Sequence, residues 1–252
     1  MAVKTDLPYP KDGYTELLRN FYASVNGANT FEEVKEWNRE KWSATVNCSR
    51  GEVLEKAGFA QLHMVGGVID EKPADLSFLE TLAYPTNPKI PGFIIMTNMN
   101  HTEAMGKMIV FYCDLVIQDG QHHEEAKALF SSALKGICEK HGHNLEEHAA
   151  MMTNRGLLGG IGGECGLLNF FEEQDMAFIE DVIKAVLTVY GEILEKGKNA
   201  VPQKADYEKM YQSRARLIEW IILEDYGIKV ARENGIVSEV IEAYAFPPVI
   251  RY

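Results

Sequence analysis

The sequence predicts an α+β fold in which a large, mainly antiparallel central sheet is flanked by helices on both faces. Segments with helical and with strand character come in mixed order along the 252 residues, without an internal repeat. The two clearest apolar runs, 93–98 and 108–117, are joined by a turn containing Gly106, as in an antiparallel pair. We therefore expect one domain over residues 1–252, with a helical arm (1–50) before the sheet and its flanking helices (51–252).

The N-terminal arm is predicted to begin with a polar surface segment, residues 1–13, and then to form two helices. Residues 15–25 are expected to form the first helix, because apolar side chains recur at the spacing of one helical face. These side chains are Leu17, Leu18, Phe21 and Val25. Thr30 and Glu33 have the spacing of a capping box, which predicts a second helix from residue 30 to about 45.

Strand character begins after residue 53. Residues 59–69 are apolar with β-branched side chains, and Gly66 with Gly67 marks a bulge or a close approach of backbone. His63 lies inside this run, and we interpret it as a core residue rather than as a ligand. Residues 79–82 form a shorter and weaker segment of the same kind.

Three helices are predicted in the middle of the chain. Residues 124–141 form an amphipathic stripe that stops at Gly142, and a short helix over 145–152 follows. Residues 175–196 form a long helix. Its expected buried face consists of Phe178, Ile179, Val182, Ile183, Val186, Leu187 and Tyr190.

The C-terminal part is predicted to combine a helical connection with a strand. Residues 201–212 are polar and read as a helical connection, whereas 217–223 read as a strand with Glu219 at its centre. Residues 238–246 are apolar and end at Pro247.

The charge excludes some classes of partner. The formal net charge is −12 and no basic stripe is present, which argues against binding to nucleic acid or to an anionic membrane surface. The four cysteines have no C-x-x-C spacing, so we expect free thiols in a reducing compartment. No apolar run reaches about 18 residues and no signal segment is evident, which predicts a cytoplasmic protein.

Neither the histidines nor the cysteines form a convincing metal or catalytic motif. His122, His123, His141, His143 and His148 cluster in sequence, but their spacing matches no H-E-x-x-H site. A metal held by Glu124 and the adjacent histidine pair is the alternative to a solvated helix end, and we predict no metal. Cys165 would need a neighbouring base to act as a nucleophile, and the sequence shows none.

Residues 155–163 contain five glycines, too many for an ordinary helix. A phosphate-binding loop is one interpretation. However, no G-K-[ST] follows, and no strand-to-helix context of the G-x-G-x-x-G type surrounds the segment.

Several stretches, in order, resemble one family. Residues 55–58 read E-K-A-G, residues 84–91 read Y-P-T-N-P-K-I-P, and residues 155–156 open the glycine-rich segment with R-G. Residues 214–220 read R-A-R-L-I-E-W, D-Y-G follows at 225–227, and the tail contains F-P-P at 246–248. This ordered set is similar to the motifs of the aerobic coproporphyrinogen III oxidase family and spans residues 53–252.

The resemblance implies a seven-stranded antiparallel sheet flanked by helices, and a homodimer. Members of that family bind coproporphyrinogen III, a tetrapyrrole with propionate side chains. They convert two propionates to vinyl groups with molecular oxygen, using neither a metal nor an organic cofactor. The implied partner is thus a small tetrapyrrole-like or aromatic molecule, and no cofactor is expected.

The resemblance also implies site residues. Asp114, in an Asp-Leu pair, matches a family carboxylate that faces pyrrole nitrogens, and Asp225 matches the aspartate of D-R-G; both are candidate catalytic residues. Arg155 matches the arginine of R-G-I-G-G and is expected to hold a carboxylate. The substrate-binding residues implied in this way are Arg155, Asn87, Asn98, Gly159, Gly160 and Arg216.

The departures from the family pattern bear on the ligand. The family's histidine and arginine in H-M-N-V-R fall on Ile94 and Asn98. The histidine of H-P-x-N-P is replaced by Tyr84, and the arginine of D-R-G by Tyr226. Because propionates prefer guanidinium partners, these losses predict a less anionic ligand than coproporphyrinogen.

Three functions follow as hypotheses. The first is a divergent enzyme that acts on a tetrapyrrole or similar flat conjugated ligand by cofactor-independent oxidation or proton transfer. The second is a non-catalytic porphyrin or haem carrier, and the third is a genuine coproporphyrinogen III oxidase. A stable porphyrin absorption band without turnover would distinguish the carrier.

Overall fold

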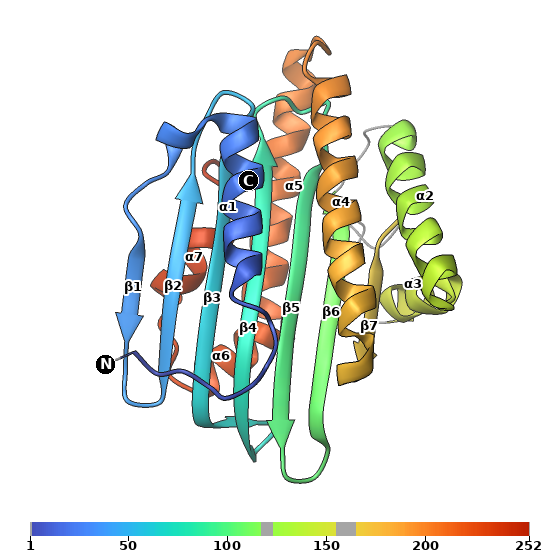
Figure 1. Cartoon of the computed structure of the whole chain (residues 1–252). Coiled ribbons are helices and arrows are strands. Elements are labelled where there is room, and N and C mark those ends of the chain that lie inside the picture. Colours follow the sequence, from blue (N-terminus) through green and yellow to red (C-terminus); the bar gives the residue numbers. More distant parts are fainter. Residues whose placement is uncertain (1, 117–122, 155–164, 252) are drawn as a thin grey trace.

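Seven antiparallel strands form one sheet, and their order in the sheet is their order in the sequence (Figure 1). The structure is a computed structural model that describes residues 2–116, 123–154 and 165–251. The strands are β1 (Lys35–Asn38), β2 (Trp42–Ser49), β3 (Leu54–Ile69), β4 (Lys72–Pro85), β5 (Gly92–Thr102), β6 (Gly106–Val116) and β7 (Leu167–Phe171). With helices packed on the sheet, this architecture confirms the predicted α+β class.

The predicted hairpin is confirmed as β5 and β6. Their register places Ile94 opposite Asp114 and Met96 opposite Tyr112. Gly106 follows the connecting turn with a positive φ of 68°, a conformation that glycine adopts without strain. The predicted irregularity at Gly66 and Gly67 is also present, as a register shift between β3 and β4.

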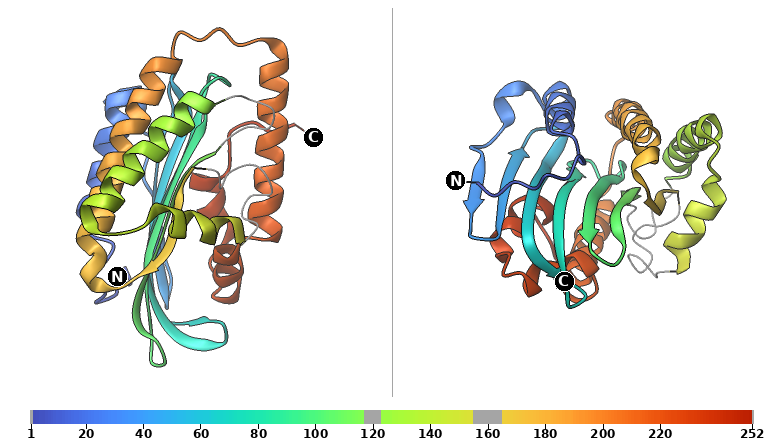
Figure 2. Two further views of the ribbon diagram at one scale, coloured as in Figure 1. Left: turned by 90° about the vertical axis from the view of Figure 1, so that its right-hand side faces the viewer. Right: turned by 60° about the horizontal axis from the view of Figure 1, so that its bottom comes forward.

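Helices cover both faces of the sheet, as predicted (Figures 1 and 2). On one face lie α1 (Gly13–Asn26), α2 (Glu124–His141) and α4 (Met176–Gly197), with α3 (Leu145–Asn154) beside β7. On the other lie α5 (Lys204–Leu223), α6 (Tyr226–Glu233) and α7 (Ser238–Ala245). We call the latter side the α5–α7 face.

Alternation along the strands assigns residues to the two faces. In β5 and β6, the side chains of Phe93, Ile95, Phe111 and Leu115 belong to the core beneath α1, α2 and α4. The intervening positions face α5–α7, where buried apolar residues form a second core: these include Leu82, Ile94, Val116, Leu217, Ile221 and Val240.

The expected helix over residues 30–45 is wrong, and with it the helical arm 1–50. Residues 35–38 and 42–49 are the edge strands β1 and β2. Trp42, Ala44 and Val46 bury alternate side chains on the α5–α7 face, a period of two that belongs to a strand. The hydroxyl of Thr30 donates to Gly27 O inside a short 3₁₀ turn instead of capping a helix.

The expected strand over residues 217–223 is also wrong, because these residues form the C-terminal turns of α5. Met210, Arg214, Leu217 and Ile221 are all buried, and they recur at three- and four-residue intervals along one helical face. Two elements, β7 and α6, had no counterpart in the prediction. The weak segment 79–82 lies within the much longer strand β4.

Gly58 of β3 lets α7 approach the sheet. A Cβ atom at this position would lie 2.5 Å from Tyr244 O and 2.7 Å from Tyr244 Cα. A Gly58→Ala variant is therefore expected to lose about 1–3 kcal/mol of unfolding free energy, the usual cost of overpacking a core. Urea denaturation measures this loss.

Gly136, on the exposed side of α2, provides the control. A Cβ atom there would meet nothing within 4 Å, so Gly136→Ala should leave stability unchanged or raise it by roughly 0.5–1 kcal/mol. A Gly58→Ala protein as stable as the wild type would contradict the close packing of α7 on β3.

Candidate functional site

Polar side chains gather at the centre of the α5–α7 face. They are Glu80 of β4, Asn98 and Asn100 of β5, and Tyr112 and Asp114 of β6. The register sets Met96 opposite both Glu80 and Tyr112, and Ile94 opposite Asp114. Since opposed residues and alternate residues share a face, these side chains form one continuous patch, which we call the polar patch.

Asp114 is completely buried at one end of the polar patch. Its Oδ1 accepts hydrogen bonds from the backbone N–H of Leu115 (2.8 Å) and from the thiol of Cys165 (3.3 Å). Gly166 packs so closely that a Cβ atom there would lie 2.8 Å from the same oxygen. Asp114 therefore holds the segment that leads into β7 against β6.

Cys165 is not equipped to act as a nucleophile. Burial, followed by the Asp114 carboxylate, raises the pKa of its thiol far above the ordinary value. A thiol that stays protonated is a poor nucleophile, so Cys165 serves here as a hydrogen-bond donor to Asp114.

Three oxygen atoms of the polar patch lack hydrogen bonds. The Tyr112 hydroxyl and the Oδ1 atoms of Asn98 and Asn100 are buried and have no partner among the described residues. Each such atom costs free energy unless something outside the folded chain satisfies it. Partly buried apolar side chains accompany them on this face, namely Phe78, Met96, Val110 and Trp220. Apolar surface with a few unsatisfied polar atoms is typical of a ligand site.

Glu80 supplies a carboxyl group to the same patch. Its Oε2 accepts a hydrogen bond of 2.6 Å from the Tyr244 hydroxyl of α7. Burial raises the pKa of Glu80 to about 8, and the charge of Asp225 adds to the rise. Glu80 in turn contributes, after burial and Asp114, to a raised pKa at Tyr112. These mutual effects place Glu80 electrostatically near both Asp225 and Tyr112.

The sequence contained a signal for Glu80 that the prediction missed. An acidic side chain stands in the middle of the strand segment F-L-E-T-L at residues 78–82. Carboxyl groups are costly at such positions unless they are paired or functional.

Asp225 caps the N-terminus of α6. Its Oδ1 accepts a hydrogen bond of 2.9 Å from the N–H of Ile228, and burial raises the pKa of its carboxyl group. It lies near Glu80 rather than in the strand register of Asp114. The structure thus gives Asp225 a helix-capping contact, while its predicted catalytic role stays a prediction.

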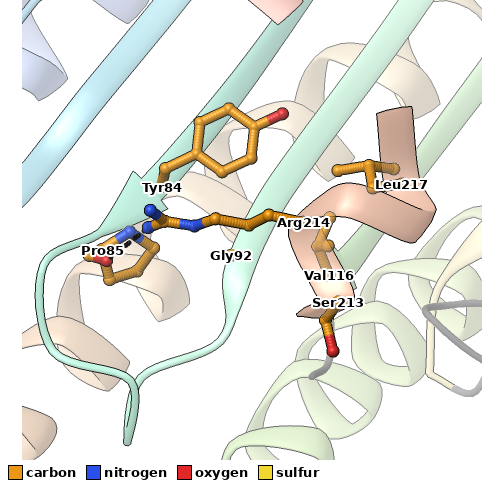
Figure 3. A pocket seen from close by; sticks show the side chains of 7 residues that line it. All are labelled: Tyr84, Pro85, Gly92, Val116, Ser213, Arg214 and Leu217. Atoms are coloured by element: carbon orange, nitrogen blue, oxygen red, sulfur yellow. Dashed lines mark hydrogen bonds between the residues drawn. The ribbon is translucent and has the colours of Figure 1, made fainter. Parts of the chain in front are cut away.

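Arg214 fills the pocket shown in Figure 3. Its buried guanidinium donates to Glu55 Oε2 (2.8 Å) and to Pro85 O (3.0 Å), and it lies 5.5 Å from the centre of the Tyr84 ring. The remaining space is about 10 Å³, room for about one water molecule. Arg214 therefore anchors α5 to the end of the sheet, and this pocket is too small for a conjugated ligand.

The other predicted substrate-binding residues are dispersed or undescribed. Asn87 lies in the β4–β5 turn, where its Nδ2 donates to Ala200 O (2.7 Å) and so ties the turn to the end of α4. Arg216 is exposed on α5. Arg155, Gly159 and Gly160 lie outside the described residues. The structure thus brings Asn98 and Asp114 onto one face, and it leaves Asn87 apart from them.

Within the described ranges, no group of three or more His, Cys, Asp or Glu side chains is arranged to hold a metal ion. His141 instead pairs with Asp181 at 2.9 Å, and His148 Nδ1 lies 2.7 Å from Asn169 Nδ2. His63 lies 3.3 Å from the hydroxyls of Thr5 and Ser77. None of the helices that the structure describes combines the length and apolarity needed to cross a bilayer.

Comparison with known proteins points in one direction. No family model matches the chain. The oxygen-dependent coproporphyrinogen-III oxidase of Rickettsia prowazekii (strain Madrid E) is 27% identical over 270 residues, which cover 94% of this chain and 91% of that protein. The similarity is nearly full-length. Proteins of the same name from Rickettsia typhi (strain ATCC VR-144 / Wilmington) and Rickettsia bellii (strain OSU 85-389) are 26% and 27% identical, with the same coverage.

This similarity supports a divergent homologue of those oxidases, in agreement with the resemblance found in the motifs. Identity is low throughout, and Ile94 and Asn98 stand where the motif has histidine and arginine. The homology therefore indicates a tetrapyrrole-related function without specifying a reaction.

Proposed function

We propose that this chain binds a tetrapyrrole, or a similar flat conjugated ligand, on the α5–α7 face and acts on it by cofactor-independent oxidation or proton transfer. The observation that carries the proposal is the polar patch: three unsatisfied oxygen atoms beside the carboxyl groups of Glu80 and Asp114. Relatives named coproporphyrinogen-III oxidase over nearly the full length support it.

The chemistry of the polar patch suits such a ligand. The Tyr112 hydroxyl and the amides of Asn98 and Asn100 offer hydrogen bonds to ring nitrogens or short polar substituents. Phe78 and Met96 provide apolar, adaptable contact area for a flat ring system. Asp114 is proposed to accept ligand N–H groups or to act as a base, and Arg155 to hold a carboxylate.

A non-catalytic carrier is the second candidate, favoured by a specific observation. Ile94, which occupies the position of the family's motif histidine, is an almost completely buried apolar side chain. Its replacement removes a candidate proton donor without an obvious substitute at the same position. A genuine coproporphyrinogen III oxidase is less well supported, because the motif arginines that would pair with propionates are absent.

The test combines ligand identification with a Tyr112→Phe variant. Mass spectrometry should find a conjugated small molecule that purifies with the protein, and titration with mesoporphyrin IX should shift the porphyrin absorption band. Removing the Tyr112 hydroxyl should weaken porphyrin binding by roughly 0.5–1.5 kcal/mol, the net value of one hydrogen bond. Stability should be unchanged or higher, because an unsatisfied buried hydroxyl is removed.

Tyr22→Phe is the matched control. The Tyr22 hydroxyl lies beneath the opposite face and hydrogen-bonds to Thr81 Oγ1 at 2.6 Å, so its loss should lower stability and leave binding intact. Conversion of the porphyrinogen form to a product of different mass distinguishes the enzyme from the carrier. A protein that neither contains nor binds a conjugated ligand at micromolar concentration would refute both candidates.

A further inference from the structure

Glu80 is an ionisable group on the α5–α7 face that no ion pair neutralises. Among the described residues, no lysine, arginine or histidine lies within salt-bridge distance of its carboxyl group, and no hydrogen bond reaches Oε1. The side chain is half-buried rather than enclosed. One oxygen is thus held by α7, and the other is left for a group outside the described chain.

The surroundings of Glu80 all disfavour a negative charge or leave it uncompensated. Tyr244 of α7 donates its hydroxyl to Oε2. Asp225, between α5 and α6, is a second acid that repels the charge. Tyr84 of β4 and Tyr112 of β6 are neutral at ordinary pH, because burial raises the pKa of both hydroxyls. The Tyr84 hydroxyl is itself directed to Ala245 O.

We propose that Glu80 is the proton donor of the site and gives its proton, through Oε1, to a basic ring nitrogen of the bound ligand. This proposal rests on the proposed function, since it needs a conjugated ligand on the α5–α7 face. The ligand class it specifies is a flat molecule with an imine-type nitrogen, as in the free-base porphyrin ring.

The step is a proton transfer without change of oxidation state. The O–H bond of Glu80 breaks, and its electron pair stays on the carboxylate. The lone pair of the ring nitrogen forms the new N–H bond. The product is an ion pair between the carboxylate and the protonated ring, and the Tyr244 hydroxyl bond to Oε2 stabilises the carboxylate.

Burial of an uncompensated carboxyl group also has a signature in the ligand-free protein. The pKa of Glu80 is raised from 4.5 to about 8, so the folded protein keeps a proton that the unfolded chain releases between these values. Stability contributed by this proton is fully present below pH 4.5 and is lost as pH rises through about 8. Glu80→Gln removes this dependence while it preserves the shape of the side chain.

The experiment measures mesoporphyrin IX affinity at pH 7 and pH 9 for the wild type and for Glu80→Gln. Wild-type affinity should fall about tenfold across this interval, because the carboxyl proton is lost around the midpoint and its loss adds a charge beside Asp225. The affinity of Glu80→Gln, which cannot ionise, should change by less than about twofold. Glu192→Gln, on the exposed side of α4, is the control and should retain the wild-type profile.

Each outcome decides a point. If the wild type binds the porphyrin with the same affinity at both pH values, or Glu80→Gln keeps the tenfold fall, the role of Glu80 is overturned and the proposed function stands. If neither protein binds at any pH, the proposed function fails and this proposal fails with it. Unfolding in urea from pH 5 to pH 8 gives a ligand-free check: a constant stability difference between the wild type and Glu80→Gln also overturns the proposal.

Discussion

Arg214→Ala is expected to lower the unfolding free energy by about 3 kcal/mol, the lower end of the usual cost of breaking a buried ion pair. The lower end applies because the partner, Glu55, keeps 29% of its side-chain surface exposed and can be partly hydrated. The variant also loses the hydrogen bond to Pro85 O and the contact with the Tyr84 ring. Since these contacts join α5 to the end of β4, the covering helix should loosen with the loss of stability.

Urea denaturation measures the loss, and hydrogen exchange in α5 reports the loosening. Glu55→Gln is the matched control: it keeps the shape of the partner and the Pro85 contact, so it should lose less than Arg214→Ala does. A loss below about 1 kcal/mol in Arg214→Ala would show that the pair behaves like an exposed salt bridge.

Asp114→Asn is expected to have two separable effects. The carboxylate is fully buried and accepts hydrogen bonds from Leu115 N and the Cys165 thiol, so the loss of its charge should cost about 1–3 kcal/mol of stability. If the carboxylate also receives ligand N–H groups, as proposed, porphyrin binding by the folded fraction should weaken by roughly 1.5–3 kcal/mol. Denaturation and absorption titration measure the two quantities independently.

Cys165→Ala separates the two roles of Asp114. It removes the thiol donor and keeps the carboxylate, so it should reduce stability while leaving ligand affinity near that of the wild type. A destabilised Asp114→Asn protein whose folded fraction binds porphyrin normally would assign Asp114 to the fold alone.

Much of the fold could be predicted because several elements carry strong periodic patterns. The helix α2 and the buried face of α4 follow directly from apolar spacing, and the β5–β6 pair follows from two apolar runs around a tight turn. The errors have one physical cause. Residues 30–45 combine a cap-like Thr30 with a short alternating run, and residues 217–223 contain an apolar run that suits either structure. Tertiary packing decides such cases.

The candidate site could be predicted only in part. Asp114 and Asn98 were reached through motif resemblance, and the structure places both on the α5–α7 face. Glu80, Asn100 and Tyr112 were missed, because their importance depends on strand register and on the absence of partners. A single sequence does not specify which side chains of β4, β5 and β6 lie beside one another.

The order of the strands has a consequence for how the molecule is assembled and opened. Each strand pairs with the strand before it, so the ladder is complete at Phe171, ahead of every residue of α5, α6 and α7. These helices contribute no strand, and they can therefore leave together without breaking a single ladder hydrogen bond. During synthesis the face stays uncovered until the last part of the chain emerges from the ribosome. In the mature protein, a bulky planar molecule can enter by withdrawal of the C-terminal segment while the sheet remains intact.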